Sequence, residues 1–572
     1  MVESAVLHTA ARPFPSLSTL PASMISNSLF AKMHDLTEEQ AMLREMVADF
    51  TDENVVPRRE ELDREAVFPR DIHEALVEMG ILGMACPEDC GGLGMGSLEL
   101  VLVYEELGRG CAGTATTIGA NLLGSDPIML YGTDAQKQRY LTQVAEGAIC
   151  AYAVTEPGAG SDVGGLKTVA TPSSDGQTWK LNGQKTFITN AGIASIYTIF
   201  ALTDPSRGPR GVSSFIAQVD PDNLPPGIEF PKKFDKMGIN ASETREIVFD
   251  DFEVKTEDLI GGKAGRGFLQ AMSVFDVSRP MIGAIGVGVG QAAFDEALKY
   301  AREREQFGQP ILHFDGLRQM FVDMWLRIEG ARAMVVGASR LVDRKYHNGE
   351  KIDVTVWSAM AKLLGSEASR VAHDALQATG GYGYINETPF PKFVRDQKVL
   401  EIFEGTNQIQ REQAGRQLIN AYSKNGTAQT PNVEPTCAAA EGWGGEFAAL
   451  AWRVIDATLE QVLADTPAGE ALHVRQDVHW ILGEMGALAE SARFLATSCS
   501  RAGESEEHFL CALSQAYSRE AVVGVAGRAE RILRSSHPEA HDAVASHLEE
   551  ARSAANGLFA FRDRLADALL NP

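Results

Sequence analysis

The spacing of apolar residues changes twice along the chain, and this restricts the possible folds more than any single motif. Apolar residues recur about every 3.6 positions from Asp35 to Gly147, alternate from Ala151, and return to the helical spacing at Gly265. We therefore expect an α+β protein with an N-terminal helical domain, a central β-barrel-like domain and a C-terminal four-helix bundle.

The chain of 572 residues is too long for one ordinary core, so several domains are expected. After the bundle, a stretch rich in Gly, Ala, Thr and Pro is typical of a linker. The predicted segments are a disordered or targeting tail (1–33), the N-terminal helical domain (34–150), the β-domain (151–260), the bundle (261–422), the linker (423–445) and an appended all-α extension (446–572).

Residues 1–33 contain one acidic residue and two basic ones, Arg12 and Lys32. A mitochondrial transit peptide is poor in acids but richer in arginine. A disordered tail, or a start codon ahead of the true one at Met24 or Met33, fits equally well. We expect a cytoplasmic location if the protein is bacterial and the mitochondrial matrix if it is eukaryotic.

The composition excludes several classes of function. A net charge of −25 argues against nucleic-acid partners, and no apolar run is long enough for a transmembrane segment. Seven cysteines are scattered along the chain, and Cys86 and Cys90 lack the second pair or His cluster of a metal site. We expect reduced thiols and no bound metal.

Within the β-domain four segments alternate as strands do, and turn residues including Asn182-Gly183 separate them. The predicted strands are Trp179–Asn190, Ile196–Thr203, Gly211–Asp220 and Glu243–Val254. The predicted bundle helices are Phe268–Phe307, Leu317–Asn348, Val354–Thr379 and Asn407–Tyr422.

The stretch EIFEGTNQIQR places Glu404 after an apolar pair and before Gly405. Thr406 or Asn407 can cap a new helix, so Glu404 is expected on a short connection between two helices. At an apolar spot a carboxylate loses water and its pKa rises, which makes it a usable base near neutral pH. Taken alone, a solvated Glu before a helix fits as well.

The glycine-rich stretch YAVTEPGAGSD, Tyr152 to Asp162, leads into the β-domain. Its glycines, with Thr155 and Ser161, offer N–H groups and hydroxyls to an anion or a flat heterocycle, although a plain turn is the simpler interpretation. No GxGxxG follows a first strand, which disfavours a Rossmann site.

Seven motifs, in order and at matching spacing over about residues 35–420, resemble the acyl-CoA dehydrogenase family. They are YAVTEPGAGSD, LNGQKTFITNAG, KMGINASETREIVFDDFEV, FDVSRP, REQFGQPI, QATGGYGY and VRDQKVLEIFEGTNQIQR.

The resemblance implies two sets of binding residues. The flavin ring of FAD is expected against Tyr152, Val154, Thr155, Phe187, Ile188 and Thr189, with Ser161 shared between FAD and substrate. Its diphosphate and adenosine are expected across a subunit interface, against Arg304, Gln306, Phe307, Gln377, Gly380, Gly381, Thr406 and Gln408. CoA and the thioester are expected at Ser161, Asp276, Arg279 and Gly405. Without the resemblance, Phe187 and Ile188 are ordinary strand core, and Arg279 is a surface arginine that opens a helix.

The resemblance also implies the reaction. Glu404 removes the α-proton of an acyl-CoA, the β-hydride passes to flavin N5, and electrons go to electron-transfer flavoprotein, leaving trans-2-enoyl-CoA. The developing enolate oxygen is stabilised by the Glu404 backbone N–H and a flavin ribityl hydroxyl. Some relatives carry the base where this chain has Ser278, and glutaryl-type relatives carry an arginine near Thr114, so a dicarboxyl substrate is not expected.

Substrate length and assembly are finer expectations. Ala115 and Gly119, on the expected floor of the acyl pocket, leave space for a medium to long chain, in keeping with fatty acid β-oxidation. The extension resembles that of very-long-chain relatives, where it covers a tetramer surface, and this favours a homodimer. The alternatives are an acyl-CoA oxidase that uses O₂, or an assembly scaffold on the same fold.

Overall fold

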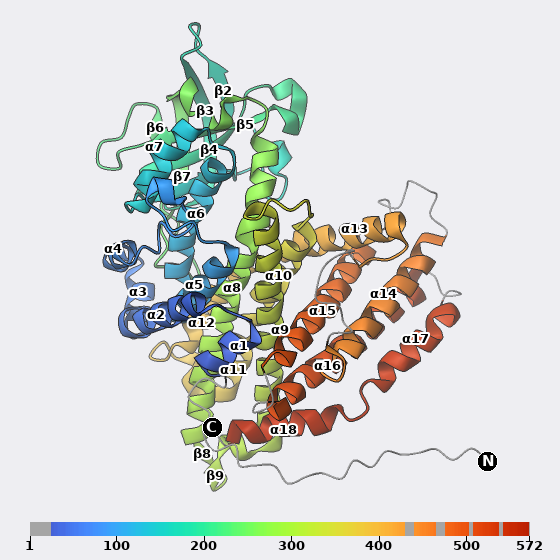
Figure 1. The fold of residues 1–572 in the computed structure, drawn as a ribbon. Helices are drawn as coiled ribbons and strands as arrows, with labels where there is room; N and C mark the ends of the chain where they lie inside the picture. The colour runs from blue at the N-terminus through green and yellow to red at the C-terminus, as the bar shows by residue number, and fades with distance from the viewer. Residues whose placement is uncertain (1–24, 430–439, 465–474, 503–506, 537–540, 571–572) are drawn as a thin grey trace, which may run out of the picture.

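The computed structural model describes residues 25–429, 440–464, 475–502, 507–536 and 541–570. A curled sheet lies at one end, long helices run away from it, and the C-terminal helices lie alongside them (Figure 1). The predicted α+β architecture is confirmed.

The N-terminal domain is built from seven α-helices, of which α5 and α6 are almost entirely buried. The cap of α2 explains its start, because Thr37 and Gln40 exchange side-chain and backbone hydrogen bonds in a capping box. The helices are α1 Asn27–Met33, α2 Glu38–Asn54, α3 Arg59–Glu65, α4 Arg70–Glu78, α5 Ser97–Gly110, α6 Ala112–Tyr131 and α7 Asp134–Ala145.

The predicted tail is wrong for its last residues, since Asn27–Met33 form a helix. Ser26 caps this helix through a hydrogen bond from Leu29 N, and Leu29, Phe30 and Met33 are buried. Burial of an apolar face therefore orders a stretch whose period was too short to detect. Residues 1–24 of the predicted tail lie outside the described residues.

The seven-stranded sheet has the order β1-β4-β2-β3-β7-β6, with β5 paired to β4. The four predicted strands are confirmed as β3, β4, β5 and β7, whereas β1, β2 and β6 were too short to predict. The strands are β1 Cys150–Ala153, β2 Val169–Pro172, β3 Thr178–Thr189, β4 Ile196–Leu202, β5 Val212–Gln218, β6 Ile228–Glu229 and β7 Thr244–Lys255.

The predicted turn at Asn182-Gly183 is wrong, because both residues lie inside β3. The register with β7 shifts between Leu181 and Gly183, and Gly183 has a φ of 148°. A side chain at Gly183 would collide with Thr168. The glycine therefore marks a bulge where two strands approach closely.

The bundle is organised around α8, a helix of 37 residues that is about 55 Å long. The helix predicted over Val354–Thr379 is two helices that break at Ser369, and α12 was not predicted. The bundle helices are α8 Gly267–Glu303, α9 Asp315–Tyr346, α10 Thr355–Ala368, α11 Val371–Thr379, α12 Phe390–Leu400 and α13 Asn407–Asn425. A small hairpin, β8 Glu305–Gln306 and β9 Gln309–Pro310, follows α8.

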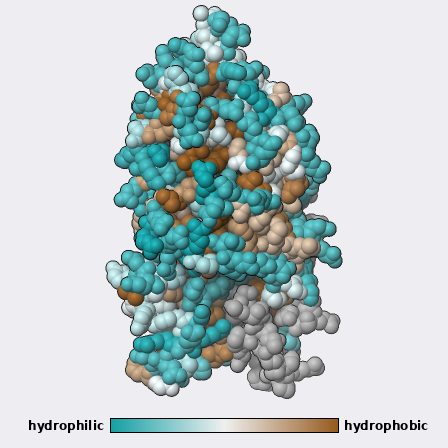
Figure 2. Space-filling model, turned by 90° about the vertical axis from the view of Figure 1, so that its left-hand side faces the viewer, coloured by the Kyte–Doolittle hydropathy of each residue, from teal (hydrophilic) through white to brown (hydrophobic). Residues whose placement is uncertain are grey.

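By length and composition, α8 is the one helix among the described residues that matches a membrane span. Most of its apolar window, 78%, is buried inside the molecule, as expected for the core helix of a bundle. The face seen in Figure 2 is mainly hydrophilic, with apolar side chains in small separate groups.

The extension comprises α14 Gly445–Ala464, α15 Gln476–Ser500, α16 Glu507–Ser536, α17 His541–Ser553 and α18 Leu558–Leu570. Its helices share one continuous hydrophobic core with the bundle. Glycines allow the close contact: Gly337 of α9 lies under the ring of Phe494 of α15, and Gly330 lies under Tyr517 of α16. The appended domain is therefore packed onto residues 25–425, the part of the chain from α1 to α13, which we call the catalytic body in anticipation of the site described below.

Candidate active site

A cavity of about 260 Å³ lies where the β-domain meets α6, α8 and the loop before α13. Ten of the predicted site residues line it: Tyr152, Val154, Thr155, Ser161, Phe187, Ile188, Thr189, Arg279, Glu404 and Gly405. The remaining wall is mostly apolar and includes Leu123, Met272, Phe275, Ile282, Ile285 and Phe403. Segments distant in sequence therefore converge on one cavity.

Glu404 lies on the connection between α12 and α13, where the sequence predicted it. Its backbone is left-handed, with a φ of 57°, which costs a non-glycine residue about 1–2 kcal/mol. Its Oε2 accepts a hydrogen bond of 2.7 Å from Ser278 Oγ of α8. Its backbone N–H has no hydrogen-bond partner among the described residues. Strain and an unused donor at one residue point to a functional position.

Burial raises the pKa of the Glu404 carboxyl above its ordinary value. The hydrogen bond from Ser278 and the positive charges of Arg279 and Lys362 oppose that rise. Lys362 is itself buried beside Asn407, and burial lowers its pKa to about 7. The pKa of Glu404 is thus set by two opposing effects: loss of water raises it, and the neighbouring donor and positive charges lower it.

Side chains of α13 hold the Glu404–Gly405 turn in place. Gln410 Nε2 donates to Glu404 O at 3.1 Å and to Gly405 O at 2.8 Å. Thr406, rather than Asn407, caps α13, and Asn407 Oδ1 instead accepts from Lys362 Nζ at 2.8 Å. Any side chain at Gly405 would collide with Gln410.

A buried ion pair anchors the glycine-rich loop against β3. Lys185 Nζ donates to Glu156 Oε1 at 2.7 Å and to Val154 O at 3.1 Å. Glu156 also accepts from the backbone N–H groups of Lys167 and Thr168. Although burial opposes ionisation, Lys185 and these donors lower the pKa of Glu156. The stretch that carries Thr155 and Ser161 is therefore fixed at both ends.

The last three residues of β3, Phe187 to Thr189, line the cavity, and several features around them suit a bound group. Phe187 has a φ of 57° and a side chain that is 64% exposed, which is unusual for an aromatic residue in a strand. The buried hydroxyl of Tyr152 has no hydrogen-bond partner. Side chains at Gly158 and Gly160 would meet nothing within 4 Å, so the loop leaves space beside it. Phe187 is therefore not the strand core of the simpler interpretation, whereas Ile188 is buried.

A second hollow, of about 600 Å³, lies at the far end of α8, near β8 and β9 (Figure 1). It is lined by the predicted residues Arg304, Gln306, Gly380 and Gly381. Phe307, 95% exposed with a φ of 53°, projects from the adjacent hairpin. The 25 residues from Arg279 to Arg304 correspond to about 37 Å of helix, so one chain holds the two sets of predicted residues far apart.

The structure does not bring every predicted residue to these two spaces. Asp276 is buried, and its Oδ2 accepts from Lys345, Tyr346 and Thr355 instead of facing the cavity. Gln377 and Gln408 are exposed and line neither space, and Thr406 is used as the helix cap. Arg279 is a buried mid-helix residue that donates to Gln413 Oε1, so it is not the surface arginine of the simpler interpretation.

The floor of the cavity is closed behind Gly119. An added Cβ there would lie 3.3 Å from Met281 Cε and 3.4 Å from Tyr104 Cε1. Ala115 is fully buried and does not line the cavity. Met281 and Tyr104 therefore fill the space behind Gly119, and Ala115 lies outside the cavity wall.

Four polar residues of the site were not predicted in these roles: Ser278, Lys362, Gln410 and Gln413. Their contacts join helices far apart in sequence, so spacing alone carried no signal for them. Among the described residues no cluster of His, Cys, Asp and Glu is arranged to hold a metal ion. The described cysteines form no disulfide.

Three family models cover most of the chain up to the extension. Residues 37–148 match the acyl-CoA dehydrogenase N-terminal domain, 151–252 the middle domain and 265–419 the C-terminal domain. The matched segments coincide with the helical, sheet and bundle regions of the structure.

Individual relatives agree with these models. The chain is 38% identical to the short-chain specific acyl-CoA dehydrogenase of Rattus norvegicus mitochondria, over 68% of this chain and 92% of the rat protein. A chain in a structure described as the electron transferring flavoprotein of Acidaminococcus fermentans is 39% identical, with a TM-score of 0.63, over 67% of this chain and 98% of that one. An acyl-CoA dehydrogenase complexed with FAD from Bacillus anthracis is 25% identical, with a TM-score of 0.83, over 94% of this chain and 95% of that one. This last match includes the extension. The chain belongs to the acyl-CoA dehydrogenase family of oxidoreductases.

Proposed function

We propose that the protein dehydrogenates an acyl-CoA thioester to trans-2-enoyl-CoA, with Glu404 as the base that takes the α-proton. The observation that carries the proposal is the carboxylate of Glu404, which is half-buried at the wall of a mainly apolar cavity and has a raised pKa. A carboxylate whose pKa is raised is a stronger base, and this suits it to remove a proton next to a thioester carbonyl.

The reaction needs a hydrogen-bond donor as well as a base, and the backbone of Glu404 offers one. An α-proton becomes acidic only if negative charge on the carbonyl oxygen is stabilised. The N–H of Glu404 has no partner among the described residues, so it is available to donate to that oxygen. Gly405, the next residue, also lines the cavity, so the thioester of a bound substrate would lie beside both residues.

Charged and polar residues at the cavity suit the CoA part of the substrate. Arg279 is buried next to Glu404 and forms no ion pair with a carboxylate within the described part of the chain. It is available to the anionic or carbonyl groups of CoA, with Ser161 on the opposite wall. Asp276 is engaged in its own buried network, so we do not include it in the substrate site.

The residues present fit FAD. Tyr152, Val154, Thr155, Phe187, Ile188 and Thr189 offer a flat, largely apolar wall with an unpartnered hydroxyl, and Arg304, Gln306 and Phe307 offer a cationic, exposed site for its distal part. Acceptance of the substrate hydride is the chemistry that FAD supplies when it is bound. The role of the chain is to bind, orient and exclude water.

An electron-transfer flavoprotein is the electron acceptor that we propose. Support comes from a similar chain that is found in a structure described as an electron transferring flavoprotein. We extend the proposal to a role in fatty acid β-oxidation, because that pathway requires the oxidation of acyl-CoA to enoyl-CoA.

For the acyl chain we revise the expectation of a medium to long substrate. That expectation rested on space beyond Ala115 and Gly119, but Met281 and Tyr104 lie against Gly119, and Ala115 does not line the cavity. The rat relative is named as short-chain specific. We therefore propose a short acyl chain, of about four to six carbons, because each further CH₂ needs a buried contact worth about 0.8 kcal/mol that the closed floor does not offer.

The experiment is anaerobic titration of the flavin-loaded protein with acyl-CoAs of graded length, followed by loss of flavin absorbance. We expect rapid bleaching with butyryl-CoA and hexanoyl-CoA and a steep fall by dodecanoyl-CoA. Met281→Ala is expected to move the preference towards longer chains. A kcat/KM that peaks at dodecanoyl-CoA in the unmodified protein would refute the short-chain proposal, and absence of bleaching with every acyl-CoA would refute the reaction.

A further inference from the structure

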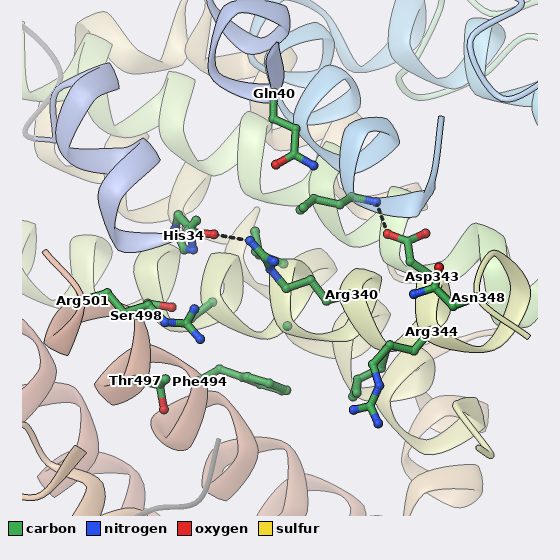
Figure 3. A pocket seen from close by; sticks show the side chains of 15 residues that line it. His34, Gln40, Arg340, Asp343, Arg344, Asn348, Phe494, Thr497, Ser498 and Arg501 are labelled. Atoms are coloured by element: carbon green, nitrogen blue, oxygen red, sulfur yellow. Dashed lines mark hydrogen bonds between the residues drawn. The ribbon is translucent and has the colours of Figure 1, made fainter. Parts of the chain in front are cut away.

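A second cavity, of about 390 Å³, lies where the extension meets the catalytic body, away from the site described above. Its walls come from α9, from α15 of the extension and from the residues that join α1 to α2. Figure 3 shows the side chains of His34, Arg340, Phe494 and Arg501 gathered around this space. Its volume is in the range of small-molecule sites.

The polar side of this cavity is cationic. Arg340 donates through Nη2 to the carbonyl oxygens of His34 and Asp35, and neither Arg340 nor Arg501 has a carboxylate partner among the described residues. Arg344 also lines the space, but it is paired with Glu350. The Asp343 carboxylate is occupied by the backbone N–H groups of Ser97 and Leu98. Two guanidinium groups therefore line the cavity without a salt-bridge partner among the described residues, although the carboxylates of Asp35, Asp343 and Glu99 lie close enough to Arg340 to act on its charge.

The buried ring of His34 lacks hydrogen-bond partners, and this is a second, independent observation that points to a ligand. Its side chain is 2% exposed, and neither ring nitrogen has a hydrogen-bond partner. Burial and the nearby arginines lower its pKa well below the ordinary value, so the ring is neutral and offers one N–H donor. A buried polar group without a partner is costly, unless a ligand supplies the partner.

Apolar side chains form the rest of the cavity wall, together with a few polar ones. Leu98 and Phe494 are buried, and Ala333, Val336 and Leu341 of α9 complete the surface. Inorganic anions alone would leave this wall without contacts, whereas a hydrocarbon body would cover it.

We propose that this cavity binds a compact organic anion, with its carboxylate or phosphate head between Arg340 and Arg501 and within reach of His34, and with its apolar body against Leu98, Val336 and Phe494. Because the site joins the extension to the catalytic body, the ligand stabilises the contact between them. This gives the extension a binding role that is separate from the proposed dehydrogenation.

The test is calorimetric titration of full-length, flavin-loaded protein with phenyl phosphate, benzoate and inorganic phosphate at constant ionic strength. We expect one binding site for phenyl phosphate or benzoate, and the better of the two identifies the head group. Inorganic phosphate is expected to bind more weakly than phenyl phosphate. Arg501→Gln is expected to weaken binding by about tenfold or more, since it removes a charge-assisted hydrogen bond.

Two further variants test whether the anion binds at this cavity or elsewhere on the surface. Arg531→Gln, on the exposed surface of α16, is the matched control and is expected to bind as the unmodified protein does. His34→Leu is expected to fold without loss of thermal stability and to bind less tightly, because it removes an unpartnered polar group. No binding by 10 mM, on the order of the weakest useful affinity, or equal binding by Arg501→Gln and the unmodified protein, would overturn the proposal.

Discussion

Ser278 Oγ on α8 donates a hydrogen bond of 2.7 Å to Oε2 of Glu404, on a loop that follows it by more than a hundred residues. The hydroxyl stabilises the charged form of a carboxylate whose pKa burial raises. Ser278 is therefore placed to orient the carboxylate of Glu404 and to oppose the rise in its pKa.

Ser278→Ala is therefore expected to raise the pKa of Glu404 further. The acidic limb of the kcat/KM profile is expected to move up by about one pH unit, because a hydrogen bond to a charged group is lost. Ser278→Thr keeps the hydroxyl and serves as the matched control. A profile for Ser278→Ala that overlays the unmodified enzyme would show that this hydroxyl does not tune the base.

Lys362 gives a prediction about stability. Burial lowers its pKa to about 7 from an ordinary value of 10.5, so between these pH values the unfolded chain binds a proton that the folded chain does not. The free energy of unfolding therefore gains a contribution that rises with pH across this window. Between pH 7 and pH 9 the gain from this group is about 2 kcal/mol. Lys362→Met is expected to lose this rise, as measured by urea unfolding at both pH values. An equal pH dependence of unfolding in Lys362→Met and the unmodified protein would show that Lys362 does not have a lowered pKa in the folded state.

The glycines under the extension give a third prediction. A Cβ at Gly337 would lie 2.5 Å from Phe494 Cδ1, so Gly337→Ala is expected to destabilise the protein by about 1–3 kcal/mol. Gly527→Ala, in α16, is the matched control: its Cβ would meet nothing within 4 Å, and the change is expected to stabilise the helix by up to about 1 kcal/mol. Thermal unfolding measures both. Equal effects would mean that the extension does not depend on this close contact.

Much of this architecture was predictable because it depends on local patterns. The long helices α8 and α9 and the strands β3, β4, β5 and β7 repeat their period often enough to identify. Asn182-Gly183 was misassigned because the dipeptide that favours a hairpin turn also suits a bulge, and only the partner strand distinguishes them. The side chains that hydrogen-bond to the segment from Glu404 to Asn407 come from α8, α10 and α13. No local sequence pattern encodes such contacts.

The separation of the two sets of predicted FAD residues leads to a prediction about assembly. Arg279 and Arg304 are about 37 Å apart along α8, so a second copy of the chain is expected to complete each cofactor site. The extension packs against α9 and α13. Because it resembles an extension that covers a tetramer surface in very-long-chain relatives, we expect a dimer rather than a tetramer. Light scattering of the flavin-loaded protein tests the dimer, and a stable tetramer would contradict it. Full FAD occupancy in a monomer would contradict the shared site, and Arg304→Ala is expected to lower the ratio of flavin to protein.

The most direct test of the proposed function is stopped-flow reduction of the bound flavin by butyryl-CoA, without oxygen, in Glu404→Gln and in the unmodified protein. Gln keeps the size and one hydrogen-bond acceptor of Glu404 but cannot take a proton. We expect the variant to retain FAD and to bind butyryl-CoA, while its rate of flavin reduction falls by about a hundredfold to ten-thousandfold. A rate within a few-fold of the unmodified protein would show that Glu404 is not the base.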